Sequence, residues 1–149
     1  MNAGSLCTRD VVTCRMTTSV VEAARLMRDR HVGDLVVIDD ASGVVRPVGL
    51  VTDRDIVLSV VAKEVDPSNL FVSDIMSAPA VVAQDADDPW RLAQHMRLHG
   101  VRRMPVADTE GRLVGLISID DILSAASGLM SELWLVTGRQ VHFEEKRRA

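Results

Sequence analysis

Hydrophobic residues follow two different spacings along this chain. Apolar positions three or four residues apart predict amphipathic helices over residues 18–30 and 87–99, each with one apolar face. Continuous apolar runs predict strands, and a glycine-containing turn between two runs is typical of a hairpin. The four runs are residues 35–39, 47–51, 103–107 and 113–117. A short strand precedes each first helix, near residues 11–13 and 80–83, and a second helix follows each hairpin.

The order strand, helix, strand, strand, helix occurs twice because the two halves of the chain repeat each other. A shift of 69 residues aligns Val37 with Val106, and after an insertion of three residues in the first copy a shift of 66 aligns Asp55 with Asp121. We therefore expect an α+β fold in which two β-α-β-β-α units pack about a pseudo-two-fold axis. The predicted segments are unit one (6–64), a linker (65–71), unit two (72–130) and a C-terminal tail (131–149) with no specified element.

Composition places the chain among ordinary globular proteins and narrows its partners. With 149 residues, 47% of them hydrophobic, it can bury a core, and the net charge of -4 gives no general attraction for nucleic acid. No apolar stretch approaches the roughly 20 residues that cross a bilayer. The first 15 residues lack the apolar core of a secretory signal, and Cys7 and Cys14 are the two cysteines, so we expect a reducing cytoplasm, with no role for either thiol.

The most informative pattern lies where each hairpin runs into its second helix. Both copies have Gly, two apolar residues, Thr or Ser, two variable residues and Asp, ending at Asp55 and at Asp121. One interpretation is a helix cap, in which Thr52 or Ser118 accepts a backbone N–H bond and the acid occupies the third helical position. A second interpretation adds a ligand, because a carboxylate at a helix start can also accept two hydrogen bonds from a ribose diol. The two interpretations are compatible.

This duplicated pattern resembles the CBS domain, named after cystathionine β-synthase, over roughly residues 6–128. The resemblance implies two CBS motifs with clefts between them that bind adenosine nucleotides or related adenosyl compounds, and it implies a homodimer. Carried onto this sequence, Asp55 and Asp121 would hold ribose hydroxyls, with Thr52 and Ser118 nearby. Glycines would allow close approach, and the first strands would contact adenine. The further residues so implied are Gly49, Gly115, Val12, Thr13, Val81 and Val82.

Positive charge near the implied clefts differs between the copies. Arg102 and Arg103, which precede the strand containing Pro105, stand where the first copy has Gly33 and Asp34. A solvated or ion-paired role and a phosphate-binding role remain open for the basic pair. Arg54, beside Asp55, is a second candidate for phosphate, but its counterpart is the anionic Asp120. We therefore expect two unequal clefts, one of them suited to phosphate, and count Arg54, Arg102, Arg103 and Pro105 among the ligand-binding residues.

Enzymatic alternatives find little support in the sequence. His95 and His99 have a helical spacing that a metal could use, but no acid follows at a metalloprotease position, and His99 fits a helix-end contact better. We expect Trp90 to pack its helix and Trp134 to cover a core edge or a dimer contact. The expected function is a non-enzymatic regulatory module that needs no cofactor, takes an adenine nucleotide as regulatory ligand and acts on an unidentified effector. The alternative is a structural and protein-interaction module without a small-molecule ligand.

Overall fold

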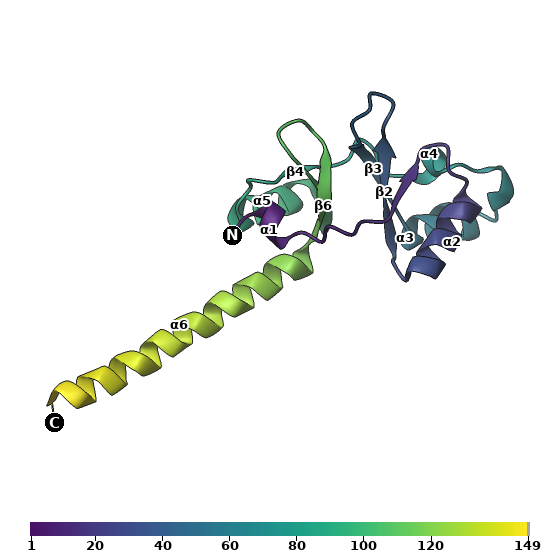
Figure 1. Cartoon of the computed structure of the whole chain (residues 1–149). Helices are drawn as coiled ribbons and strands as arrows, with labels where there is room; N and C mark the ends of the chain where they lie inside the picture. Colours follow the sequence, from purple (N-terminus) through teal and green to yellow (C-terminus); the bar gives the residue numbers. More distant parts are fainter. Residues whose placement is uncertain (149) are drawn as a thin grey trace.

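Two three-stranded sheets with flanking helices form the body of the molecule, and one long helix projects from it (Figure 1). The computed structural model describes residues 1–148. The first half contains α1 (Ala3–Leu6), β1 (Thr13–Arg15), α2 (Val20–Arg30), β2 (Asp34–Asp39), β3 (Arg46–Thr52), α3 (Asp53–Ile56), the π-helix η1 (Val57–Val61) and the 3₁₀-helix η2 (Pro67–Asn69). The second half contains α4 (Val72–Ile75), β4 (Ala83–Gln84), α5 (Pro89–His99), β5 (Arg103–Ala107), β6 (Leu113–Ser118) and α6 (Ile119–Arg148).

The two sheets share one topology, which confirms the predicted α+β repeat. Their orders are β1-β2-β3 and β4-β5-β6, and in each sheet the first strand is parallel to the second and the second antiparallel to the third. Both predicted hairpins are therefore confirmed. The first strand of each sheet starts later than predicted, at Thr13 instead of 11 and at Ala83 instead of 80. Farther upstream, Thr8 is bridged to Leu116 and Ser77 to Leu50, so each leading segment passes the other sheet before it reaches its own.

The first long helix of each unit begins and ends as its sequence dictates. Ser19 and Asp88 accept the backbone N–H three residues on, and Pro89 occupies the first turn of α5, where its missing N–H costs little. Each helix then stops at a left-handed residue, His31 with φ 55° and Gly100 with φ 64°. Both helices thus cover their sheets over the predicted lengths, to within two residues.

Each unit has its own hydrophobic core, and a short helix from the other half of the chain packs into each core. Ala3 of α1 is fully buried with Leu92 and Met104 in the core of the second sheet. Val72 of α4 is fully buried with Leu35 in the core of the first sheet. The leading segments are therefore exchanged between the units, whereas the predicted boundaries at residues 6 and 72 follow the sequence repeat.

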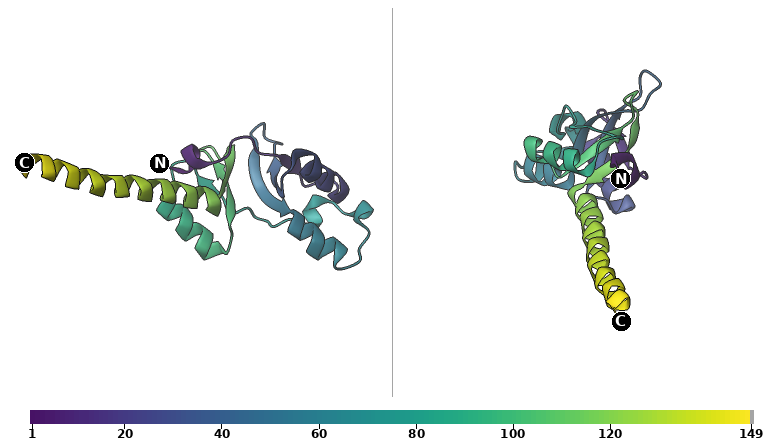
Figure 2. Two further views of the ribbon diagram at one scale, coloured as in Figure 1. Left: turned by 90° about the horizontal axis from the view of Figure 1, so that it is seen from below. Right: turned by 90° about the vertical axis from the view of Figure 1, so that its left-hand side faces the viewer.

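Three sequence expectations differ from the structure. Trp90 does not pack its helix, because 75% of its surface is exposed on the outer face of α5. Trp134 is 80% exposed and covers no core edge, so of its two expected roles only the dimer contact stays a prediction. The segment beyond Met130, for which the sequence specified no element, continues α6 to Arg148 as one helix that leaves the body (Figure 2).

Candidate functional site

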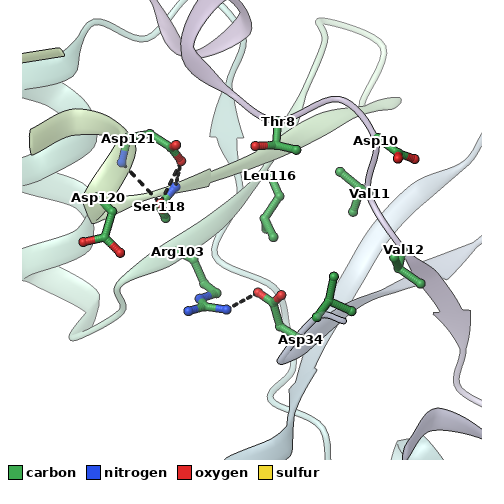
Figure 3. Close-up of a pocket in the computed structure, with 11 residues that line it drawn as sticks. Thr8, Asp10, Val11, Val12, Asp34, Arg103, Leu116, Ser118, Asp120 and Asp121 are labelled. Carbon is green, nitrogen blue, oxygen red and sulfur yellow. Dashed lines mark hydrogen bonds and ion pairs between the residues drawn. The ribbon is translucent and has the colours of Figure 1, made fainter. Parts of the chain in front are cut away.

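A cavity of about 270 Å³ lies between the two units, where the N-terminal segment passes the start of α6 (Figure 3). This volume is close to the lower end of the range for small-molecule pockets, roughly 300–1,000 Å³. Four of the predicted ligand-binding residues meet here, namely Val12, Arg103, Ser118 and Asp121. The other lining residues are Thr8, Asp10, Val11, Val32, Asp34, Leu116 and Asp120. The segment that leads into β1 and the start of α6 therefore line the same cavity.

Asp121 performs the capping role and still faces the cavity. Its Oδ2 accepts hydrogen bonds from the Ser118 backbone N–H and from Ser118 Oγ, both at 2.7 Å. Among residues 1–148, its other oxygen, Oδ1, accepts no hydrogen bond from the protein. The cap holds the carboxylate in place, and the free oxygen keeps its capacity for a donor on a ligand.

The first copy repeats this cap with Thr52 and Asp55. The Thr52 backbone N–H donates to Asp55 Oδ2 at 2.8 Å, and the Asp55 N–H donates to Thr52 Oγ1 at 3.1 Å. Both side chains are half-buried, but neither lines the cavity beside Asp121. By the repeat they belong to a second, equivalent position, so the predicted residues separate into two groups.

The motif glycines admit another backbone. A Cβ atom on Gly115 would lie 2.6 Å from the Thr8 carbonyl oxygen, and one on Gly49 would lie 2.8 Å from that of Ser77. Thr8 is held there by two hydrogen bonds with Leu116, each 2.9 Å long. Each glycine therefore lets the exchanged leading segment cross the sheet edge. At Gly115 the crossing segment contains Thr8, which forms part of the cavity wall.

Arg103 forms an ion pair with Asp34, which is its own counterpart in the first copy. The two side chains lie at the first residues of β5 and β2, so the pair bridges the units near the pseudo-two-fold axis (Figure 3). Asp34 is 11% exposed and Arg103 is 42% exposed. Arg102 and Arg54 are exposed and lie outside the cavity lining. The basic pair Arg102-Arg103 thus divides into one surface residue and one cavity residue.

Pro105 makes the two sheets unequal beside the first strands. In the first sheet the Val36 N–H donates to the Val12 carbonyl oxygen at 3.1 Å. Pro105 occupies the equivalent position in β5 and has no N–H, so the Val81 carbonyl cannot receive the matching bond. The second sheet accordingly pairs one residue fewer, and the backbone at Val81 and Val82 stays outside the ladder.

Charge in the cavity is predominantly negative. The lining contains four carboxylates, on Asp10, Asp34, Asp120 and Asp121, and the Arg103 guanidinium, which is already paired. Sequence reasoning did not find Thr8 or Asp10, because nothing in their local pattern indicates that the N-terminal segment crosses to the other unit. The exposed Asp120 carboxylate stands where the first copy has Arg54.

The thiols and histidines form no second site in the described part of the chain. Burial, with Glu22 nearby, raises the pKa of Cys14 to about 11, and burial also raises the pKa of Cys7. His99 Nδ1 lies 2.9 Å from the His95 carbonyl oxygen, the expected helix-end contact. Across residues 1–148, no three His, Cys, Asp or Glu side chains are grouped to hold a metal ion, and no helix has the length and hydrophobicity of a membrane span.

Known proteins share this fold and sequence. The CBS domain family matches residues 3–62 and 72–128. An uncharacterized protein from Methanopyrus kandleri is 30% identical over 133 residues, which cover 89% of this chain and 66% of that protein. The hexameric CBS-CP12 protein from bloom-forming cyanobacteria superposes with a TM-score of 0.74 at 33% identity, over 83% of this chain and 66% of that one.

A third similar protein carries a ligand. A CBS domain protein from Pyrobaculum aerophilum, complexed with AMP, has a TM-score of 0.71 at 30% identity, over 81% of this chain and 89% of that one. Two segments of this chain match the same family, and the two units share one topology. The chain therefore belongs to the CBS domain family and contains two CBS domains in tandem.

Proposed function

We propose that this chain is a non-enzymatic sensor that binds adenosine-containing ligands between its two CBS domains. The observation that carries the proposal is the Asp121 carboxylate, which lines a cavity of about 270 Å³ and uses only its Oδ2 in the helix cap. Ribose offers two adjacent hydroxyl donors, which match a carboxylate acceptor. The AMP complex of the similar Pyrobaculum protein supports an adenylate as the ligand class.

Charge favours different ligands at the two positions. Four carboxylates around the cavity disfavour a phosphate there, because like charges at short range repel in a partly dehydrated site. The Asp121 cavity therefore suits adenosine or a cationic adenosyl compound. At the equivalent position, Arg54 replaces Asp120 beside Asp55 and supplies a guanidinium for a phosphate. We assign AMP or ADP to the Asp55 position.

The ion pair between Arg103 and Asp34 supplies a route from ligand to conformation. It joins the two domains, and a ligand that contacts either side chain changes the strength of that connection. Binding then shifts the population between two relative arrangements of the domains, by as much as the ligand prefers one of them. A partner protein, or a second copy of this chain, would respond to that arrangement.

Calorimetry on the full chain tests the proposal. Titrations with adenosine, AMP, ADP, ATP and S-adenosylmethionine are compared for wild type, Asp55→Ala and Asp121→Ala. We expect each variant to lose binding at one position by roughly 10- to 100-fold, the loss of one hydrogen bond to a charged group. Asp74→Ala is the matched control, because Asp74 accepts a capping bond from the Phe71 N–H at 2.8 Å but lies outside the cavity.

The alternative, an interaction module without a small-molecule ligand, predicts that none of these compounds binds. In that case no compound in the series releases heat or raises the melting temperature, and Asp121→Ala affects stability to the same extent as Asp74→Ala. If the compounds bind both Asp55→Ala and Asp121→Ala as tightly as they bind wild type, the ligand lies elsewhere. That result would overturn the assignment of the site.

A further inference from the structure

The C-terminal part of α6 has an apolar stripe that touches nothing else in the described chain. From Ala126 to Arg148 every residue is exposed, including large apolar side chains. Those from residue 129 onward are Leu129, Met130, Leu133, Trp134, Leu135, Val136, Val141 and Phe143. A lone helix of this composition exposes more contiguous apolar surface than a monomeric protein normally leaves uncovered, which indicates a partner.

Half of these large apolar residues, Leu129, Leu133, Val136 and Phe143, have the spacing of a coiled-coil seam. Residues follow one another at alternating steps of three and four, which keeps them on one seam of a helix that wraps around another. The seam residues are Ala126, Leu129, Leu133, Val136, Gln140 and Phe143. Gly128 and Gly138 lie on the outward side, where nothing is within 4 Å of an added Cβ. The partner is therefore expected to be a helix of similar pattern.

We infer that α6 pairs antiparallel with α6 of a second copy of this chain, with the two-fold axis crossing the seam between Leu133 and Val136. This register places Leu133 opposite the partner's Val136, and the small Ala126 opposite the large Phe143 of the partner. In a parallel pair the two Ala126 side chains would face each other and leave a gap.

Charge complementarity selects the same arrangement. Glu132 and Arg139 flank the seam on one side. In this register Glu132 lies beside Arg139 of the partner subunit, and the reverse pair forms by symmetry. The acidic first turn of α6, with Asp120 and Asp121, comes near the basic last turn of the partner, which contains Lys146, Arg147 and Arg148. A parallel pair would instead bring the two basic ends together, and antiparallel registers shifted by one heptad would oppose Glu132 to Glu132 or Arg139 to Arg139.

Analytical ultracentrifugation of the full chain without added ligand tests this pairing. Leu133→Glu puts a charge into the seam and is expected to weaken self-association at least about tenfold. Leu135→Glu is the matched control, because Leu135 is 60% exposed, Leu133 is 54% exposed and Leu135 points outward from the seam. A monomeric wild type, or equal behaviour of the two variants, would overturn the inference. Thermal unfolding of the body checks that both variants fold, since neither residue contacts it.

Charge exchange decides the orientation. Glu132→Arg and Arg139→Glu should each weaken the dimer, and the double exchange should restore it, because antiparallel pairing sets the two residues against each other. Failure of the double exchange to restore the dimer would overturn the antiparallel register, since Arg139 would then face Glu144 of a parallel partner. If wild type associates and none of these substitutions weakens the association, the contact lies in the body of the molecule. That result would also refute the pairing of α6.

Discussion

Replacing Gly115 by alanine should destabilise the protein by disrupting the crossing of the N-terminal segment over β6. The new Cβ would lie 2.6 Å from both the Thr8 carbonyl oxygen and the Cys7 sulfur. Real carbon contacts do not occur at this distance, so the segment must move. Thr8 resists, because two hydrogen bonds of 2.9 Å tie its backbone to Leu116.

The size of the effect follows from these contacts. Overpacking costs about 1–3 kcal/mol, and loss of the two hydrogen bonds adds about 1–3 kcal/mol if the segment detaches. We expect about 2–6 kcal/mol in total, which for a chain of this length lowers the melting temperature by roughly 4–24 °C. Because Thr8 lines the cavity, ligand binding at Asp121 should weaken as well.

Differential scanning calorimetry measures the loss, with two reference variants. Gly128→Ala adds the same methyl group to an open position of α6 and should stabilise that helix by up to about 1 kcal/mol. Gly49→Ala should cost less than Gly115→Ala, because its contacts with Ser77 and Met76 are 2.8 Å and 3.1 Å. If Gly115→Ala has the same melting temperature as wild type, the leading segment does not cross the sheet edge as described. The proposed role of Thr8 in the cavity wall would then be wrong.

Three further changes test the cap, the core and a buried thiol. Asp121→Ala should lower the unfolding free energy by about 1 kcal/mol through loss of the cap, and no change in urea denaturation would contradict the cap. Leu92→Ala should cost about 2–5 kcal/mol, whereas Trp90→Ala should stay within about 0.5 kcal/mol; equal losses would refute the burial pattern. Between pH 9.0 and about 11 the unfolded chain loses the Cys14 proton that the folded chain keeps. Stability should therefore fall with rising pH, less so in Cys14→Ala, and parallel pH curves would count against this thiol's burial.

Sequence reasoning predicted the parts of the fold that depend on local pattern. The capping pairs at Thr52 and Ser118, the proline in the first turn of α5 and both hairpins follow from residues within a few positions of each other. These features are local because backbone donors at a helix start need acceptors nearby in the chain. The position of Asp121 at the start of a helix therefore follows from the sequence pattern around it.

Long-range features could not be predicted in the same way. Nothing near Ala3 or Val72 indicates that each enters the core of the opposite unit, because a short apolar segment fits either core equally well. The exposure of Trp90 is similar, since an aromatic residue near the start of an amphipathic helix can face either way. The helix beyond Met130 was missed, although the steps of three and four residues from Leu129 to Phe143 are visible in the sequence.

The two copies are alike in their cores but differ in charge at the cavity between them. Each core requires closely similar volumes, so positions such as Val37 and Val106 remain identical. Cavity positions have no such requirement, and there the copies differ in charge, with Asp34 against Arg103. Because these two meet as an ion pair, the charge difference between the copies also joins the domains. In the proposed sensor, a ligand that displaces either side chain would act on both domains at once, and this shared contact would couple the two positions.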